Sequence, residues 1–208
     1  APNAEESVNE PLISGELKGS KTKKAKQTIY GATEWTLKNG VKVVVLPTEH
    51  KKDQVLLNLE FKGGKTLIAT EDLPSFEDNI WGLFLRNSGV SKFSGTALPK
   101  MLAGKTAGAN PFISNLSHGI QASSTPKDLE TALQIAYLYF AEPRFDQDEY
   151  NVGIQQIEAI LPNMKNTPDY KFGLELNKVL YDGNPRVVSL DEETLAKANL
   201  ATLEKNYD

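Results

Sequence analysis

The sequence predicts an α+β fold in which helices pack on one face of an antiparallel or mixed sheet. Three β-patterned segments come early in the chain, a further pair lies near its middle, and helix-patterned segments follow. Strands and helices are therefore grouped into separate runs instead of alternating. Grouping of this kind indicates α+β and argues against a doubly wound parallel sheet.

The first three strands are predicted by period-two alternation or by β-branched runs over residues 34–38, 41–46 and 55–61. Trp35 and Leu37 lie on one side of the first strand. Asn39-Gly40 follows and predicts a type I′ hairpin turn, and Pro47 ends the second strand because it lacks a backbone donor. We expect the three strands to form one sheet that organises the fold.

The first long helix is expected to begin at Ser75, a good N-cap, with Glu77 and Asp78 in its first turn. Asn87-Ser88-Gly89 ends it. The remaining patterns predict helices over residues 96–102, 125–142, 146–161 (closed by Pro162), 169–181 and from 191 to the end, and strands over 109–114 and 119–124.

Composition limits the classes of function. The chain has 208 residues, of which 39% are hydrophobic, so it can bury a core. A net charge of −4 gives no reason to expect a nucleic-acid partner. The absence of cysteine excludes thiolate metal sites and disulfides. The longest apolar run, residues 132–140, is too short for a membrane span.

Residues 1–30 contain few large apolar groups and two blocks of charge, first glutamates and then lysines. We expect a flexible linker there and a single α+β domain over residues 31–208. The lysines of this segment also fit a nucleic-acid or membrane patch, but no aromatic residue is interspersed among them before Tyr30. A chain that opens with Ala-Pro-Asn is expected to be a piece processed or excised from a longer protein.

No residue is predicted to be catalytic, cofactor-binding or metal-binding. His50 and His118 are the only histidines and lie 68 residues apart, so we interpret them as a loop histidine and a strand-edge histidine. There is no G-x-S-x-G motif around Ser123-Ser124. Gly104-Lys105-Thr106 resembles the end of a phosphate loop, but residue 99 is proline where that loop needs glycine.

Two other groups of residues have structural explanations. Acidic residues stand at predicted helix N-termini, where the helix dipole favours them: Glu77-Asp78, Asp146/Asp148/Glu149 and Asp191-Glu192-Glu193. Trp81 and Phe84 lie at helical spacing and are expected in the core, with contact to a partner domain or substrate as the alternative.

Several segments, in their order and spacing, resemble the insulinase-like (pitrilysin, inverzincin) zinc metallopeptidases, in particular large periplasmic zinc proteases of Gram-negative bacteria. The resemblance covers about residues 30–208, and its segments are 35–48, 98–105, 127–133 and 137–146. Family members consist of two similar halves, each with two α+β domains, that close around a peptide-binding chamber.

The resemblance implies a domain without the catalytic zinc. In the family, a helix after the third strand carries H-x-x-E-H, whose two histidines bind zinc with a downstream glutamate as third ligand. The equivalent helix here, residues 76–88, has no histidine, and the glutamate would fall within Gly153-Ile-Gln-Gln156. The segment therefore resembles the first domain of the second, non-catalytic half, with residues 1–30 as the tether between halves.

Further expectations follow from the resemblance. Zinc is implied only for the other half of the parent protein, the partners are other domains of the same polypeptide and its peptide substrate, and the location is the periplasm or cell envelope. A peptide-binding or assembly scaffold without proteolytic role is the alternative. We also expect the domain to lack its last strand, so that an unpaired sheet edge favours self-association.

Overall fold

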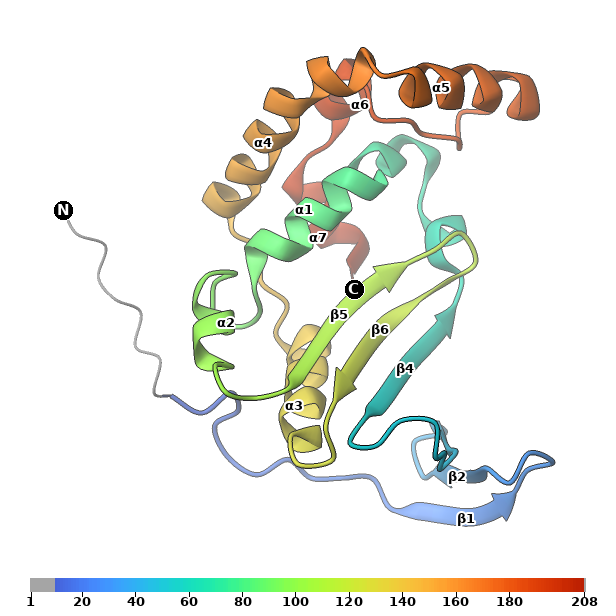
Figure 1. Ribbon diagram of the computed structural model, residues 1–208, viewed down its shortest axis with the longest axis vertical. Helices are drawn as coiled ribbons and strands as arrows, with labels where there is room; N and C mark the ends of the chain where they lie inside the picture. The colour runs from blue at the N-terminus through green and yellow to red at the C-terminus, as the bar shows by residue number, and fades with distance from the viewer. Residues whose placement is uncertain (1–9, 208) are drawn as a thin grey trace. The chain divides into compact units, whose positions relative to one another are not determined.

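Two antiparallel sheets of three strands each organise the computed structural model, which describes residues 10–207 (Figure 1). They belong to two compact units divided between Gln54 and Val55. Residues 11–54 form the N-terminal unit, and residues 55–207 belong to the main unit. This division differs from the single domain expected over residues 31–208.

The N-terminal unit is a three-stranded sheet in the order β1-β2-β3. Its strands are β1 (Thr22–Gln27), β2 (Thr33–Leu37) and β3 (Lys42–Val45). Strand β1 lies inside the segment expected to be a linker. It acquires its order from hydrogen bonding along β2, with Ala25 opposite Trp35. A strand paired in this way needs no apolar core of its own, which is why composition did not predict it.

The turn between β2 and β3 is not the predicted two-residue type I′ turn. Only Gly40 has a positive φ, of 92°, whereas the predicted turn requires a positive φ at Asn39 as well. The Gly40 N–H donates to Leu37 O at 3.0 Å, and the Leu37 N–H donates to Val41 O at 2.8 Å. These bonds define a three-residue loop with glycine in the left-handed position.

The sheet of the main unit has the order β4-β6-β5. It contains β4 (Val55–Lys62), β5 (Ala107–Ile113) and β6 (Ser117–Ser124). The prediction that β4 continues the sheet of β2 and β3 was wrong. The whole of β4 pairs instead with β6, from Val55 opposite Ser124 to Lys62 opposite Ser117, and sequence alternation alone does not name the partner of a strand.

Helix α3 (Leu129–Ala141) packs against β5 and β6. The sheet turns small and apolar side chains toward it, including Ile120 and Ala122 of β6. Strands β4 and β6 approach closely at Gly119, where an added Cβ would lie 1.8 Å from the carbonyl oxygen of Leu59. Only glycine fits at this position of the β4–β6 pair.

Helix α1 (Asp78–Ser88) begins two residues later than predicted. It follows two 3₁₀ segments, η1 (Gly64–Leu67) and η2 (Thr70–Phe76), and Ser75 lies inside η2. The N-cap is Glu77, whose carboxylate accepts the N–H groups of Asn79 at 2.9 Å and Ile80 at 3.3 Å. Ser75 is buried and its hydroxyl accepts the Asn199 N–H instead.

The other helices follow the predicted order. They are α2 (Ala97–Met101), α4 (Gln147–Lys165), α5 (Pro168–Tyr181), α6 (Glu192–Lys197) and α7 (Leu200–Tyr207). Pro162 does not end α4, because the buried Leu161 and the partly buried Met164 hold its last turn on the core. The single last helix expected from residue 191 is two helices, since Ala198 is extended.

The core of the main unit lies between the helices and η2. Trp81 and Phe84 of α1 are buried there, as predicted. Trp81 lies 5.5 Å from Phe76 between ring centroids, and Phe84 stacks on Phe145 at 5.5 Å. Helices cover the sheet on the α3 side, so the predicted α+β class is confirmed.

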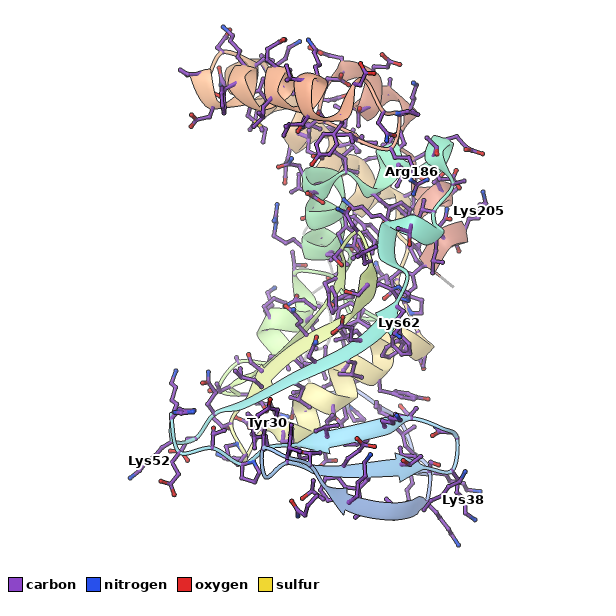
Figure 2. All side chains as sticks on the ribbon, turned by 90° about the vertical axis from the view of Figure 1, so that its right-hand side faces the viewer. Tyr30, Lys38, Lys52, Lys62, Arg186 and Lys205 are labelled. Atoms are coloured by element: carbon purple, nitrogen blue, oxygen red, sulfur yellow. The ribbon has the colours of Figure 1, made fainter. Side chains whose placement is uncertain are left out.

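Arg186 fixes the segment between α5 and α6 to the 3₁₀ segments (Figure 2). Its guanidinium donates to the carbonyl oxygens of Ile68 at 3.1 Å and Lys65 at 2.6 Å, and to the Thr70 hydroxyl at 3.1 Å. Lys205 of α7 bonds Asp72 of η2 in a similar way. Both contacts join parts of the chain more than 100 residues apart.

Candidate functional site

Helices α1 and α4, which the sequence resemblance would align with the zinc-binding elements of the insulinase-like family, pack against each other. Their contact is close at Gly153 of α4. An added Cβ there would lie 3.1 Å from Nδ2 of Asn87 and 3.7 Å from Cβ of Leu83. A glycine, an amide and a leucine therefore occupy the place where these helices meet.

These residues do not fit a catalytic zinc ion. Zinc requires imidazole, thiolate or carboxylate ligands, whereas the contact between α1 and α4 offers an amide and apolar atoms packed closely around Gly153. Within residues 10–207, no three histidine, aspartate or glutamate side chains gather as metal ligands.

The two histidines belong to different units and have different surroundings. His50 is exposed in a bend of the N-terminal unit. His118 lies on β6, the central strand of its sheet, and not on an edge strand. Its ring stacks on Phe61 with centroids 5.7 Å apart, and its Nδ1 accepts the Gly64 N–H at 3.2 Å. His118 therefore holds the β4–η1 corner against β6.

The two remaining sequence motifs, Ser123-Ser124 and Gly104-Lys105-Thr106, take part in the packing of the fold. Ser124 is buried at the end of β6, whereas Ser123 is exposed on the opposite face of that strand. The Lys105 ammonium donates to the Thr131 hydroxyl at 3.0 Å, which ties the loop before β5 to α3. Neither motif belongs to a cluster of reactive side chains.

The face of the main sheet turned away from the core carries a row of exposed amides. The register places Asn58 of β4 opposite Gln121 of β6, and Gln121 opposite Asn110 of β5. Directly opposed residues point to the same face of a sheet. Each amide carries two donor hydrogens and an acceptor oxygen. The Asn58 amide donates one hydrogen to the Glu60 carboxylate at 3.1 Å, and the remaining groups of this amide row can hydrogen-bond an extended peptide laid across the three strands.

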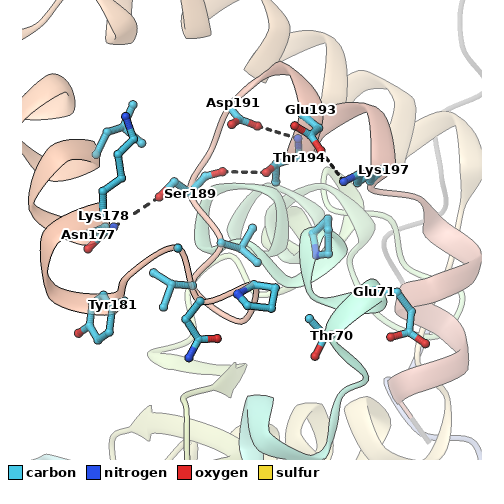
Figure 3. A pocket seen from close by; sticks show the side chains of 17 residues that line it. Thr70, Glu71, Asn177, Lys178, Tyr181, Ser189, Asp191, Glu193, Thr194 and Lys197 are labelled. Carbon is cyan, nitrogen blue, oxygen red and sulfur yellow. Dashed lines mark hydrogen bonds and ion pairs between the residues drawn. The ribbon is translucent and has the colours of Figure 1, made fainter.

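A cavity of about 670 Å³ lies between α5, α6, η2 and the segment of residues 183–189 (Figure 3). Most of its polar side chains, though not those of Glu71 and Tyr181, already have partners within residues 10–207 of the protein. Thr194 donates from its hydroxyl to Ser189 O at 2.8 Å, and Lys197 pairs with Glu193 at 2.6 Å. Asn177 reaches the Ser189 hydroxyl at 3.4 Å. The cavity is therefore lined mostly by groups that already have partners, which gives no reason to assign it a ligand.

Ionisable groups around this cavity serve the packing of α4, α5 and α6. The Lys165 ammonium lies 2.6 Å from a carboxylate oxygen of Glu192, and this hydrogen bond raises the pKa of Lys165 and lowers that of Glu192. The Tyr170 hydroxyl donates to Leu190 O at 2.6 Å, and burial raises the pKa of Tyr170. Asp191 caps α6 by accepting the Thr194 N–H at 2.7 Å.

Helix α5 presents its apolar residues to solvent. Phe172 is 68% exposed, Val179 80% and Leu180 61%. With Leu176 they follow the spacing of one helical face. These residues lie on a helix, as predicted, but their exposure was not expected from the sequence.

The fold is that of a segment of insulinase-like (M16) proteases, which confirms the resemblance at the level of fold. The chain is similar to the periplasmic protease PqqL from Escherichia coli, with a TM-score of 0.75 and 15% identity, over 96% of this chain and 22% of that one. It is also similar to the ferredoxin protease FusC, solved with Arabidopsis ferredoxin, with a TM-score of 0.71 and 17% identity.

The FusC match covers 99% of this chain and again 22% of the other. The chain thus spans less than a quarter of each of these proteases. No protein-family model matches the sequence, and no curated protein does so either. Among the described residues, no helix has the length and apolar character needed to cross a membrane.

Sequence reasoning missed the amide row and the exposed face of α5. The amide row had a signal, since exposed residues, most of them polar, alternate with half-buried or buried ones along 55–60 and 120–124. What was lacking was the pairing of β4 with β6, which brings Asn58 beside Gln121. The α5 stripe had the periodicity of a buried face, and only coordinates distinguish a stripe that faces the core from one that faces solvent.

Proposed function

We propose that this chain is a non-catalytic domain of a larger zinc-dependent endopeptidase of the insulinase-like family. It contributes to the wall of the peptide-binding chamber and to an interface between domains. The observation that carries the proposal is the match of nearly the whole chain to less than a quarter of two proteases, PqqL and FusC. In this proposal the zinc belongs to another part of the parent protein.

The contact between α1 and α4 supports a non-catalytic role. These are the helices on which the family builds its zinc site, and here their meeting point is filled by Gly153, Asn87 and Leu83. Hydrolysis of a peptide bond would have to take place on another domain. One matched protease is periplasmic, and we propose the same compartment, or the cell envelope, for the parent of this chain.

The amide row supports a role in holding peptide. Asn58, Gln121 and Asn110 lie side by side on an exposed sheet face, and the Glu60 carboxylate beside them accepts a hydrogen bond from Asn58. Amide side chains can hydrogen-bond the backbone groups of a peptide as donors and as acceptors. A substrate lying on this face would be positioned by these side chains while chemistry takes place elsewhere.

A scaffold without proteolysis is the second candidate, because the same amide row would serve simple peptide binding. Zinc content by elemental analysis and peptidase activity distinguish the two. We expect neither in the isolated chain, and both in the longer polypeptide. Stoichiometric zinc in the isolated chain would overturn the non-catalytic role. A longer polypeptide without zinc or activity would favour the scaffold.

The amide row is tested by replacing Asn58, Gln121 and Asn110 together with alanine in the longer polypeptide. Loss of up to three peptide hydrogen bonds should raise KM about ten-fold and leave kcat unchanged, because such bonds hold substrate and transition state alike. Asn115→Ala, which removes an exposed amide outside the row, is the control. An unchanged KM in the triple variant would exclude the row from substrate binding.

A further inference from the structure

The outer face of α5 has the composition of a buried helix surface. Phe172, Leu176, Val179 and Leu180 form one stripe, which we call the α5 stripe, and all four are exposed. Side chains of this kind together expose several hundred Å², and apolar patches of about 300–600 Å² often mark interaction sites. The α5 stripe is therefore large enough to be the apolar centre of an interface.

The attachment of α5 to the rest of the main unit is weak for a helix of this length. None of the 14 described residues of α5 is buried. Its inner side is held by the hydrogen bond of Tyr170 to Leu190 O and by the longer contact of Asn177 with Ser189. Short helices owe most of their stability to packing of an amphipathic face, so α5 needs a second packing surface.

Gly173 adds an independent observation. It lies next to the α5 stripe, three residues before Leu176, and a Cβ at this position would meet no atom within 4 Å. Glycine in a helix interior costs about 1 kcal/mol relative to alanine, and no contact within the main unit explains it. A glycine beside an apolar stripe lets a second helix or strand approach the backbone closely.

Outside the stripe, the surface of α5 is polar and carries both signs of charge. Glu175 and Lys178 form an exposed ion pair at 2.7 Å on the same helix. An apolar centre with a polar rim is the usual anatomy of an interface between folded protein surfaces. The partner that fits is thus a folded element with an apolar face, not nucleic acid or an anionic lipid surface.

We propose that the α5 stripe docks against another domain of the same, longer polypeptide. This inference rests on the proposed function, and it names the surface through which the interface forms. The occupant follows from length: in the two matched proteases, 78% of the chain (100% minus the matched 22%) lies outside the region equivalent to this one. The surface that packs on the α5 stripe would belong to that other part of the polypeptide.

The test uses the absence of cysteine from the chain. Val179→Cys is introduced into residues 1–208 and into the longer polypeptide, and the rate of reaction with a maleimide is measured under native conditions. We expect reaction to be about ten-fold slower in the longer polypeptide, because closure of an interface protects a side chain from solvent reagents. Lys178→Cys, whose parent side chain is 67% exposed one residue away, is the matched control.

The outcomes separate the inference from the proposed function. Slow labelling of residue 179 with fast labelling of residue 178 supports the interface, and equal rates for residue 179 in the two proteins overturn it. Protection that appears in residues 1–208 alone and grows with protein concentration assigns the stripe to a second copy, which also overturns it. Zinc and activity of the longer polypeptide are measured separately, so protection without activity would refute the proposed function only.

Discussion

The hydroxyl of Tyr207 donates a hydrogen bond to the carbonyl oxygen of Tyr139 at 2.9 Å. This bond joins α7, near the end of the chain, to α3, the helix that covers the main sheet. The ring of Tyr207 also lies edge-on to Phe145, with centroids 5.5 Å apart. Burial raises the pKa of Tyr207, so the hydroxyl stays protonated and can donate over the physiological range.

Tyr207→Phe keeps the ring and removes the donor. We expect a loss of about 1 kcal/mol in the free energy of unfolding, the usual contribution of such a bond, measured by urea denaturation at pH 7. Tyr181→Phe, at an exposed tyrosine on α5, is the control and should change nothing. Equal stability of Tyr207→Phe and the parent would show that the bond makes no net contribution.

Tyr150 should make the stability of the main unit fall at alkaline pH. Burial raises the pKa of its hydroxyl to about 12, against 10 in the unfolded chain. The folded state therefore holds its proton more tightly, and this contribution is complete below pH 10 and is lost as pH rises from 10 toward 12. Urea unfolding at pH 8 and pH 11 should show the decline, and Tyr150→Phe should reduce it.

The same substitution should be harmless or stabilising at pH 7. Among the described residues the buried Tyr150 hydroxyl has no hydrogen-bond partner, and an unpaired buried polar group costs about 1 kcal/mol or more. A clear loss of stability in Tyr150→Phe at pH 7 would mean that the hydroxyl is bonded.

Asp72 should contribute to stability in the opposite pH range. Hydrogen bonds from Lys205 and Asn206 lower the pKa of its carboxyl group below 3.8. The contribution is present above that pH and is lost as pH falls through the lowered pKa. Asp72→Asn should cost about 0.5 kcal/mol at pH 7, since Lys205 is exposed to solvent. This difference should shrink at pH 3, and a difference independent of pH would contradict the assignment.

Gly119→Ala should be among the most damaging single changes in the main unit. Its Cβ would lie 1.8 Å from Leu59 O, and backbone cannot move aside without breaking the pairing of β4 with β6. We expect a loss of about 3 kcal/mol, seen as a lower urea midpoint. Gly108→Ala on β5, where the Cβ meets nothing within 4 Å, is the matched control. Similar losses at both positions would refute the steric explanation.

The elements of the fold were largely predictable from the sequence, because period and capping are local properties. Asp146 and Asp191 cap α4 and α6, at whose N-termini they were predicted to lie, and Gly89 ends α1. Pairing was not predictable in the same way. The strand at 55–61 alternates correctly, yet its partner is β6, some 60 residues later, because the alternation is equally satisfied by either sheet.

The N-cap of α1 was predicted wrongly for a related reason. Ser75 and Glu77 are both acceptable N-caps, and the hydroxyl of Ser75 is taken by the Asn199 N–H, a contact 124 residues away. The amide row and the α5 stripe were harder still to predict from the sequence. Whether Phe172 is core or interface depends on what lies above α5, which no local pattern encodes. The fold class followed from local signals, whereas these assignments depended on tertiary contacts.

The positions of the two tryptophans allow the unfolding of each unit to be followed by intrinsic fluorescence. Trp35 lies on β2 of the N-terminal unit, and Trp81 is buried in the aromatic core of the main unit. Each unit thus carries one of the chain's two indole fluorophores. With either indole replaced by phenylalanine, the remaining emission band follows one unit alone. The melting of one unit can then be timed against the other without attaching any dye.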